Sequence, residues 1–373
     1  MKERWTNIVL VGVVAVAAIV VFRVSADSLA LPGPSPAPTF TPARTPVLAP
    51  DALRVFPIGA IPADARFVML GDPGDERLLL LDLVAKKITL AAHFEGTGAF
   101  VNGRLVESTS LGSGKIVVVN VRADGPDARV YVLKPETAEV RSFTTPRSDG
   151  PRLSPDGVTL AVSRNSADPD QHGLWLTNTN DGTSRRLIGD AGRRATRAVL
   201  WSSDGKRLSA LVDLGAGKTQ LVIVDPSGSV TPVPGDASDA RWRGTDLLYW
   251  NVFASGPVAR YDAAGGVAVS PAYPAPSGII VDRAEVRPRS LDLAVREHEV
   301  TGTLRIVIYD AASGTTTVKL ADASLVLSFW WSSDATRLYA WTIDNATTTV
   351  TDILTDTKAV TFCYRKKIEP PCQ

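Results

Sequence analysis

Residues that most often carry chemistry are scarce in this sequence. Three histidines and two cysteines occur among 373 residues, and no Gly-x-Ser-x-Gly, His-Glu-x-x-His, Gly-x-Gly-x-x-Gly or P-loop motif is found. A hydrolase nucleophile elbow, a zinc-peptidase helix and a nucleotide-binding loop are therefore missing. We predict no catalytic or metal-binding residue and no cofactor, and a protein that is not an enzyme is the favoured class.

An excess of charge of one sign is also missing. Forty Lys and Arg residues against 39 Asp and Glu residues give a formal net charge of +1. Nucleic-acid-binding surfaces usually need a strong basic excess, so no nucleic-acid partner is expected. We interpret the densest basic cluster as solvated loop charge, with a patch for an acidic partner as the alternative. It comprises Arg185, Arg186, Arg193, Arg194 and Arg197.

One stretch near the N-terminus is hydrophobic enough to enter a membrane. Lys2 and Arg4 precede the uncharged segment 8–22. Residues 1–26 fit a retained signal anchor and also a signal peptide that is cleaved after Ala26. Both alternatives place the rest of the chain outside the cytoplasm, as a single-pass membrane protein or as a secreted one.

A proline-rich linker is predicted at 27–50. Such a segment is extended and semi-rigid, and a tether of this kind is useful only if the chain before it stays in the membrane. The linker therefore favours the anchor, and residues 51–373 are predicted to form the folded domain.

A short repeat of strand, turn and strand organises that domain. Its clearest copy spans 201–210 and reads Trp-Ser-Ser-Asp-Gly-Lys-Arg-Leu-Ser-Ala, in which Asp-Gly predicts a tight hairpin. Similar copies lie at 152–162 and 329–340, with fainter ones at 240–249 and 286–295. Equivalent positions are 48, 41, 43 and 45 residues apart, which is typical of propeller blades with four short strands each.

The Ser-Pro-Asp-Gly and Trp-Ser-Ser-Asp-Gly motifs resemble the WD40-like repeats of TolB-type propellers, which also occur in the propeller halves of prolyl-oligopeptidase-like enzymes. The resemblance covers three copies well, at 153–162, 200–212 and 330–341. It implies a fold and not an activity, because propellers have many functions. We therefore predict an all-β, monomeric β-propeller of seven blades, with six as the alternative.

The repeat spacing also assigns residues to blades. Blade 1 is predicted from the strands 66–70 and 77–83, and blade 2 from 116–121 and 128–133. Residues 53–56 are expected to pair with the last blade and close the ring, which would remove an exposed sheet edge. The seven predicted blades are 58–93, 94–147, 148–192, 193–236, 237–278, 279–322 and 323–364.

Tryptophans and cysteines give two further expectations. Several tryptophans recur at equivalent blade positions and are expected to pack between blades, with ligand stacking as the alternative. Trp330 and Trp331 face opposite ways on a strand, so at least one should be buried. Cys363 and Cys372 are expected to form a disulfide in an exported protein, which would stabilise it by roughly 2–3 kcal/mol. Two free thiols are the alternative.

Three functions remain open at this point. The favoured one is a membrane-tethered binding module whose partner is an envelope protein or a cell-surface polymer. The second is a hydrolase or lyase with two carboxylates at the central channel, one of which would have a raised pKa. The third is a sensor that binds a small ligand in the channel.

Overall fold

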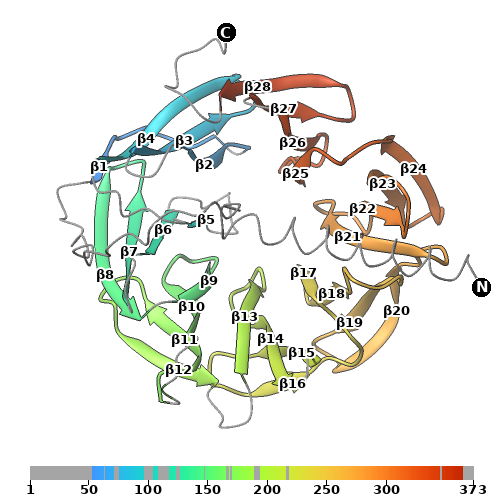
Figure 1. Cartoon of the computed structure of the whole chain (residues 1–373), viewed down its shortest axis with the longest axis horizontal. Coiled ribbons are helices and arrows are strands. Elements are labelled where there is room, and N and C mark those ends of the chain that lie inside the picture. The colour runs from blue at the N-terminus through green and yellow to red at the C-terminus, as the bar shows by residue number, and fades with distance from the viewer. Residues whose placement is uncertain are drawn as a thin grey trace, which may run out of the picture. The chain divides into compact units, whose positions relative to one another are not determined.

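The described strands form a β-propeller. The computed structural model describes residues 53–62, 64–70, 75–95, 104–107, 117–122, 127–146, 148–164, 168, 170–188, 194–215, 218–344 and 347–363. Within these residues, 28 strands form seven four-stranded antiparallel sheets, which we call blades 1 to 7. The sheets form a ring (Figure 1), and the region along its axis is called the central channel below. The predicted all-β propeller is confirmed.

Blades 1 to 3 are as follows, from the channel outward. Blade 1 contains β2 (Arg66–Leu70), β3 (Asp75–Asp82), β4 (Lys87–Glu95) and β1 (Leu53–Val55). Blade 2 contains β5 (Arg104–Glu107), β6 (Val117–Arg122), β7 (Asp127–Lys134) and β8 (Glu139–Pro146). Blade 3 contains β9 (Ser148–Leu153), β10 (Thr159–Arg164), β11 (Gly173–Asn178) and β12 (Ser184–Ile188).

Blades 4 to 7 repeat this order. Blade 4 contains β13 (Arg194–Trp201), β14 (Leu208–Gly215), β15 (Lys218–Val224) and β16 (Val230–Pro232). Blade 5 contains β17 (Asp239–Arg243), β18 (Asp246–Trp250), β19 (Val258–Asp262) and β20 (Val267–Tyr273). Blade 6 contains β21 (Ile279–Val286), β22 (Leu293–Glu299), β23 (Arg305–Asp310) and β24 (Thr315–Leu320). Blade 7 contains β25 (Val326–Trp331), β26 (Leu338–Asp344), β27 (Thr347–Asp352) and β28 (Thr357–Cys363).

Several N- and C-terminal predictions lie outside the described residues. They concern the hydrophobic segment 8–22, the linker 27–50 and Cys372; only the backbone of Cys363 is described, at the end of β28. Across the parts of the chain that the structure describes, we find no helix with the length and hydrophobicity that a membrane crossing requires.

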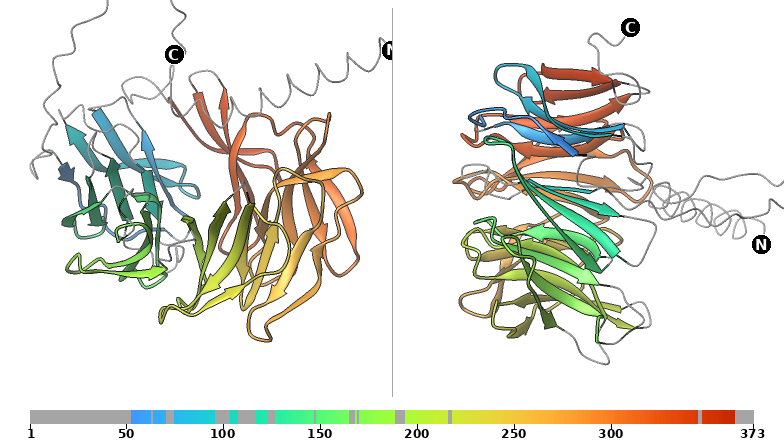
Figure 2. Two further views of the ribbon diagram at one scale, coloured as in Figure 1. Left: turned by 60° about the horizontal axis from the view of Figure 1, so that its bottom comes forward. Right: turned by 90° about the vertical axis from the view of Figure 1, so that its left-hand side faces the viewer.

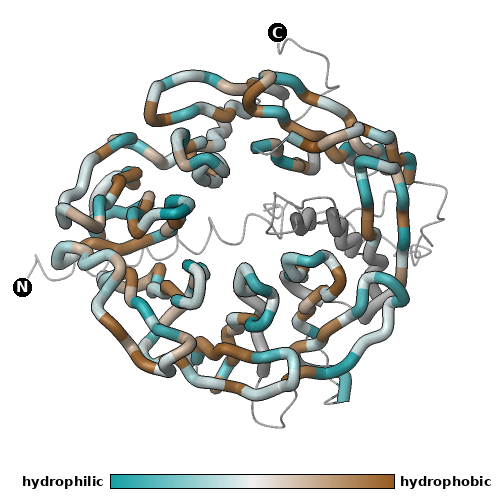
Figure 3. The backbone as a smooth tube through the Cα atoms, turned by 180° about the vertical axis from the view of Figure 1, so that it is seen from behind, coloured by the Kyte–Doolittle hydropathy of each residue, from teal (hydrophilic) through white to brown (hydrophobic). Residues whose placement is uncertain are grey.

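The middle strands of the blades are hydrophobic on both faces. In β10 all residues but the first are buried, and the first five residues of β14 are buried as well. A blade packed between two neighbours has no solvent face, so its middle strands cannot show the alternation of a half-buried strand. The outermost strand β24 is exposed along nearly its whole length. The hydrophobic stretches within the sheets are visible in Figure 3.

Seven hydrophobic clusters hold neighbouring blades together. Each contains buried residues from two adjacent blades, and together they cover every pair around the ring, including blades 7 and 1. The cluster between blades 7 and 1 joins Leu79 and Leu81 to Tyr339 and Val350. Figure 2 shows the blades side by side around the ring. Side-chain packing therefore closes the propeller.

The predicted pairing of residues 53–56 with the last blade is wrong. β1 pairs with β4 of blade 1, and Leu53 lies opposite Phe94. Blade 1 receives only β2, β3 and β4 before the chain enters blade 2, so β1 covers the edge of β4. Blade 7 already has its own fourth strand, β28. Leu53 and Val55 also pack against the cluster between blades 1 and 2.

A buried serine organises the hairpin between the first two strands of three blades. Ser332 Oγ donates a hydrogen bond to Asp334 Oδ1 (2.6 Å) and accepts one from the backbone N–H of Arg337 (2.9 Å). Ser154 and Ser202 make the equivalent contacts in blades 3 and 4. The three serines are at most 3% exposed. The hairpins predicted from Asp-Gly are confirmed, and the serine is the residue that links their two strands.

Replacing this serine should destabilise the propeller. Ser332→Ala removes two hydrogen bonds from a buried position, so we expect the free energy of unfolding to fall by about 1–2 kcal/mol. Urea denaturation followed by tryptophan fluorescence measures the change. Ser333→Ala is the matched control, because that side chain is exposed and its effect should stay within about 0.5 kcal/mol. Equal losses in the two variants would contradict the assigned role.

The same hairpin predicts a dependence of stability on acidic pH. Hydrogen bonds from Ser332 Oγ and from the N–H and hydroxyl of Thr336 lower the pKa of Asp334 to about 2. The folded-state pKa lies below the unfolded value of about 4, so this stabilisation is complete above pH ~4 and is lost as the pH falls toward 2. In Asp334→Asn, the melting temperature should decline less across this interval than in the wild type. If the melting temperatures of the variant and the wild type decline equally between pH ~4 and 2, the contribution assigned to Asp334 is wrong.

Candidate functional site

A large cavity lies at one end of the central channel. It has a volume of about 650 Å³. Its walls come mainly from the innermost strands of six blades, β2, β9, β13, β17, β21 and β25. Pro155 and Ser203, in the hairpin turns of blades 3 and 4, also line it. It therefore lies at the end of the channel where the serine hairpins are.

Among the described residues that line this cavity, the charged ones are four arginines and one glutamate. Their formal charges sum to +3. The arginines come from four different blades. This excess of positive charge makes the cavity suited to anions and not to cations. The arginines are Arg66, Arg152, Arg241 and Arg283.

The glutamate is held by two of the arginines. Glu285 Oε1 lies 2.7 Å from Arg283 Nη2 and 3.4 Å from Arg241 Nε. Arg241 also contacts Asp239 Oδ1 at 3.3 Å. A partly buried charge cluster needs such pairing, because removing one partner leaves another charge desolvated and uncompensated.

Opposing effects set the ionisation of this cluster. Burial acts most strongly on Glu285 and raises its pKa, but Arg283, Arg241 and Arg66 together lower the pKa further, so the net direction is downward. Burial lowers the pKa of Arg241, and Glu285 and Asp239 more than offset it. Both groups are therefore ionised at neutral pH. A carboxylate with a lowered pKa is a poor general acid.

Tryptophans form the other part of the lining, and they have two roles. Trp201 and Trp242 donate their indole N–H groups to the backbone carbonyls of Arg152 (2.9 Å) and Leu200 (3.0 Å), on the innermost strand of the preceding blade. Inter-blade packing is thereby confirmed for these two. Trp330 is half-buried and faces the cavity, and the guanidinium carbon of Arg66 lies 5.1 Å from the centre of its ring.

The prediction for the adjacent tryptophans of β25 is confirmed. Trp331 is buried, with 6% of its surface exposed, in the cluster between blades 6 and 7. Trp330, its neighbour in sequence, lines the cavity instead. The alternation of side chains along a strand explains the difference.

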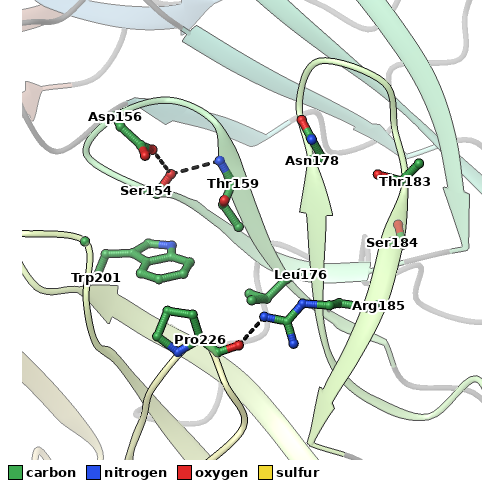
Figure 4. A pocket seen from close by; sticks show the side chains of 11 residues that line it. Ser154, Asp156, Thr159, Leu176, Asn178, Thr183, Ser184, Arg185, Trp201 and Pro226 are labelled. Atoms are coloured by element: carbon green, nitrogen blue, oxygen red, sulfur yellow. Dashed lines mark hydrogen bonds between the residues drawn. The ribbon is translucent and has the colours of Figure 1, made fainter.

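A second cavity of about 370 Å³ lies between blades 3 and 4 (Figure 4). Much of its polar lining is already used by the local structure. Ser154 bonds to Asp156 and to the N–H of Thr159, and Arg185 donates to the carbonyl of Pro226. Its Trp201 is almost fully buried. This cavity is best described as a groove between blades, and the channel-end cavity is the stronger candidate site.

The described residues of the basic cluster are divided between two strands of different blades. Arg185 and Arg186 are exposed on β12, the outermost strand of blade 3. Arg194 and Arg197 belong to β13, the innermost strand of blade 4. Arg193 lies outside the described residues. Residues that are close in sequence are separated here because the chain passes from the rim of one blade to the channel side of the next.

The channel-end cavity was not predicted, although the repeat contains a signal for it. Five residues lie two positions before the turn residues Ser154, Ser202, Gly244, Arg287 and Ser332, and all five line the cavity. Reading that column of the repeat across the blades would have located the site. These five residues are Arg152, Leu200, Trp242, Glu285 and Trp330.

Comparison with known proteins supports the fold alone. No protein-family model and no curated protein matches the chain. An oligogalacturonate lyase structure with manganese is similar with a TM-score of 0.54 and 12% identity, over 79% of this chain and 83% of the lyase. A prolyl endopeptidase is similar with a TM-score of 0.58 and 12% identity, over 82% of this chain and 49% of that one. TolB from Acinetobacter baumannii aligns with a TM-score of 0.46 and 12% identity, over 79% of this chain and 77% of TolB.

The two adjacent tryptophans provide a test of which residues line the cavity and which support the core. Trp331→Ala removes a buried ring and should lower the free energy of unfolding by about 3–5 kcal/mol. Trp330→Ala should cost less than half as much, because its ring is partly in contact with the cavity. Urea denaturation of both variants measures this, and a Trp330 loss as large as that of Trp331 would show that the ring is part of the core.

Proposed function

We propose that this protein is a non-enzymatic binding module whose working surface is the channel-end cavity. The observation that carries the proposal is the lining of that cavity, which combines four arginines, half-buried tryptophans and a single glutamate paired with two of the arginines. Cavities with an apolar lining and a few convergent charged groups are the usual sites of ligand binding. The serine hairpins at its rim give it a rigid frame.

The enzymatic alternative has less support in the described residues. A propeller hydrolase or lyase of the predicted kind needs two facing carboxylates, one with a raised pKa. Among the described residues, the lining contains one carboxylate, Glu285, and its pKa is lowered. A sensor would use the same cavity for a small ligand and is a variant of the binding proposal.

The proposal includes a location and a class of partner. Segment 8–22 would anchor the chain in the cytoplasmic membrane and the linker 27–50 would hold the propeller away from the lipid surface. The partner is an envelope protein or a cell-surface polymer. Support for both comes from the order of charged, hydrophobic and proline-rich segments in the sequence.

Site-specific cross-linking in cells tests the proposal. A photo-reactive residue is placed at Ser203, which is exposed and lines the cavity, or at Thr301, which is exposed in the turn between β22 and β23. Because strands alternate in direction, these two turns lie at opposite ends of the strands. We expect a reproducible cross-linked species in the full-length protein from position 203 and not from position 301.

Two results would contradict the working surface. Capture of the same species from both positions would show contact without a preferred face. Capture from position 301 alone would assign binding to the opposite face of the propeller.

A further inference from the structure

We infer that the ligand of the channel-end cavity is an acidic saccharide, whose carboxylate or phosphate groups bind the arginines while its rings pack on the tryptophans. This inference rests on the proposed function, because it names the class of ligand for the same cavity. The ligand must have groups that bind the arginines and a surface that packs on the tryptophans, because both line the cavity.

The charge and its distribution indicate several acidic groups. Arg66, Arg152, Arg241 and Arg283 come from blades 1, 3, 5 and 6. Arg241 and Arg283 meet at Glu285, and Arg152 adds a positive charge from blade 3, so charge enters the cavity at more than one point. A nucleotide gathers its charge in one phosphate chain and presents one aromatic base. A chain of acidic sugars presents one charge per ring, which fits the spread of the guanidinium groups.

The geometry around Glu285 shows that the cavity can bind a carboxylate. Arg283 approaches Glu285 Oε1 with both Nε (2.8 Å) and Nη2 (2.7 Å), and Arg241 reaches the same oxygen from a second blade. Guanidinium groups bind carboxylate and phosphate strongly because their N–H groups form a planar fork. Glu285 therefore occupies two of the four arginines as an internal anion.

The aromatic surface suits a sugar ring. One face of a pyranose carries mainly C–H bonds, is weakly hydrated, and packs against the flat face of an indole. Trp330 is half-buried beside the cavity, and the guanidinium group of Arg66 lies over its ring, 5.1 Å from the ring centre. A sugar ring that packs on the part of Trp330 left accessible would place its acidic substituent near that guanidinium group. The volume of about 650 Å³ accommodates more than one such ring.

Titration calorimetry on the full-length chain in mild detergent tests the ligand class. The probes are tetragalacturonate, its fully methyl-esterified form, glucose 6-phosphate and ATP. We expect tetragalacturonate to bind at least about tenfold more tightly than the uncharged ester, because charge-assisted hydrogen bonds to arginine are lost in the ester. Raising the salt concentration should weaken binding of the acid form.

Variants assign the binding to the cavity. Arg66→Gln and Arg152→Gln should each weaken binding of tetragalacturonate about tenfold, and either one suffices if the other fails to fold. The matched control is Arg141→Gln, which changes an exposed arginine on the outer strand β8 and should leave binding unchanged. Glu285→Gln should strengthen binding several-fold, because it releases Arg283 and removes one of the two carboxylates that contact Arg241. A purely structural role for Glu285 predicts weaker binding instead.

Each outcome decides the inference. Tighter binding of glucose 6-phosphate than of tetragalacturonate identifies a ligand with one phosphate group and contradicts the inference of several acidic groups. Equal binding of the acid and its ester, tighter binding of ATP than of every saccharide, or an unchanged affinity in both arginine variants overturns it. If no saccharide binds but position 203 still captures a partner in cells, the ligand class is wrong and the binding module stands. If position 203 captures nothing as well, both fail.

Discussion

The packing of each blade between two neighbours is the constraint on which the structure depends. It forces the middle strands to be hydrophobic on both faces, as in β10, and it produces one buried cluster for every pair of adjacent blades. Blades 7 and 1 share no strand, yet the cluster that joins Leu81 to Tyr339 closes the ring between them. The backbone N–H of Ser333 also donates a hydrogen bond to Asp64 Oδ1 at 2.7 Å, across the same pair of blades.

The repeat also connects the fold to the candidate site. In three blades a buried serine joins the first two strands immediately before the turn. The residue two positions before that serine lies on the innermost strand and on the same face at each repeat, so it faces the channel. Arg152 and Trp330 occupy this position in blades 3 and 7 and line the cavity. The serine hairpin thus fixes where this residue lies, while the type of side chain at the position differs from blade to blade.

Electrostatics gives the cavity its character. Arginines contributed by four blades converge on a volume partly shielded from water, where charges interact more strongly than at an open surface. Glu285 offsets part of this charge through Arg241 and Arg283 and remains ionised because of them. The lining of the cavity therefore keeps a formal positive excess.

The sequence by itself determined the blades. Asp-Gly hairpins and hydrophobic runs located strands correctly even in blades 1 and 2, where 66–70 became β2 and 116–121 overlaps β6, because strand and turn preferences are local. Only the tertiary structure decided where β1 pairs and which residues meet at the channel. A free strand can cover any open edge, and the choice of β4 depended on which blade lacked a fourth strand. Arg66 and Arg283 lie more than two hundred positions apart, and the closing of the ring alone brings them to one cavity.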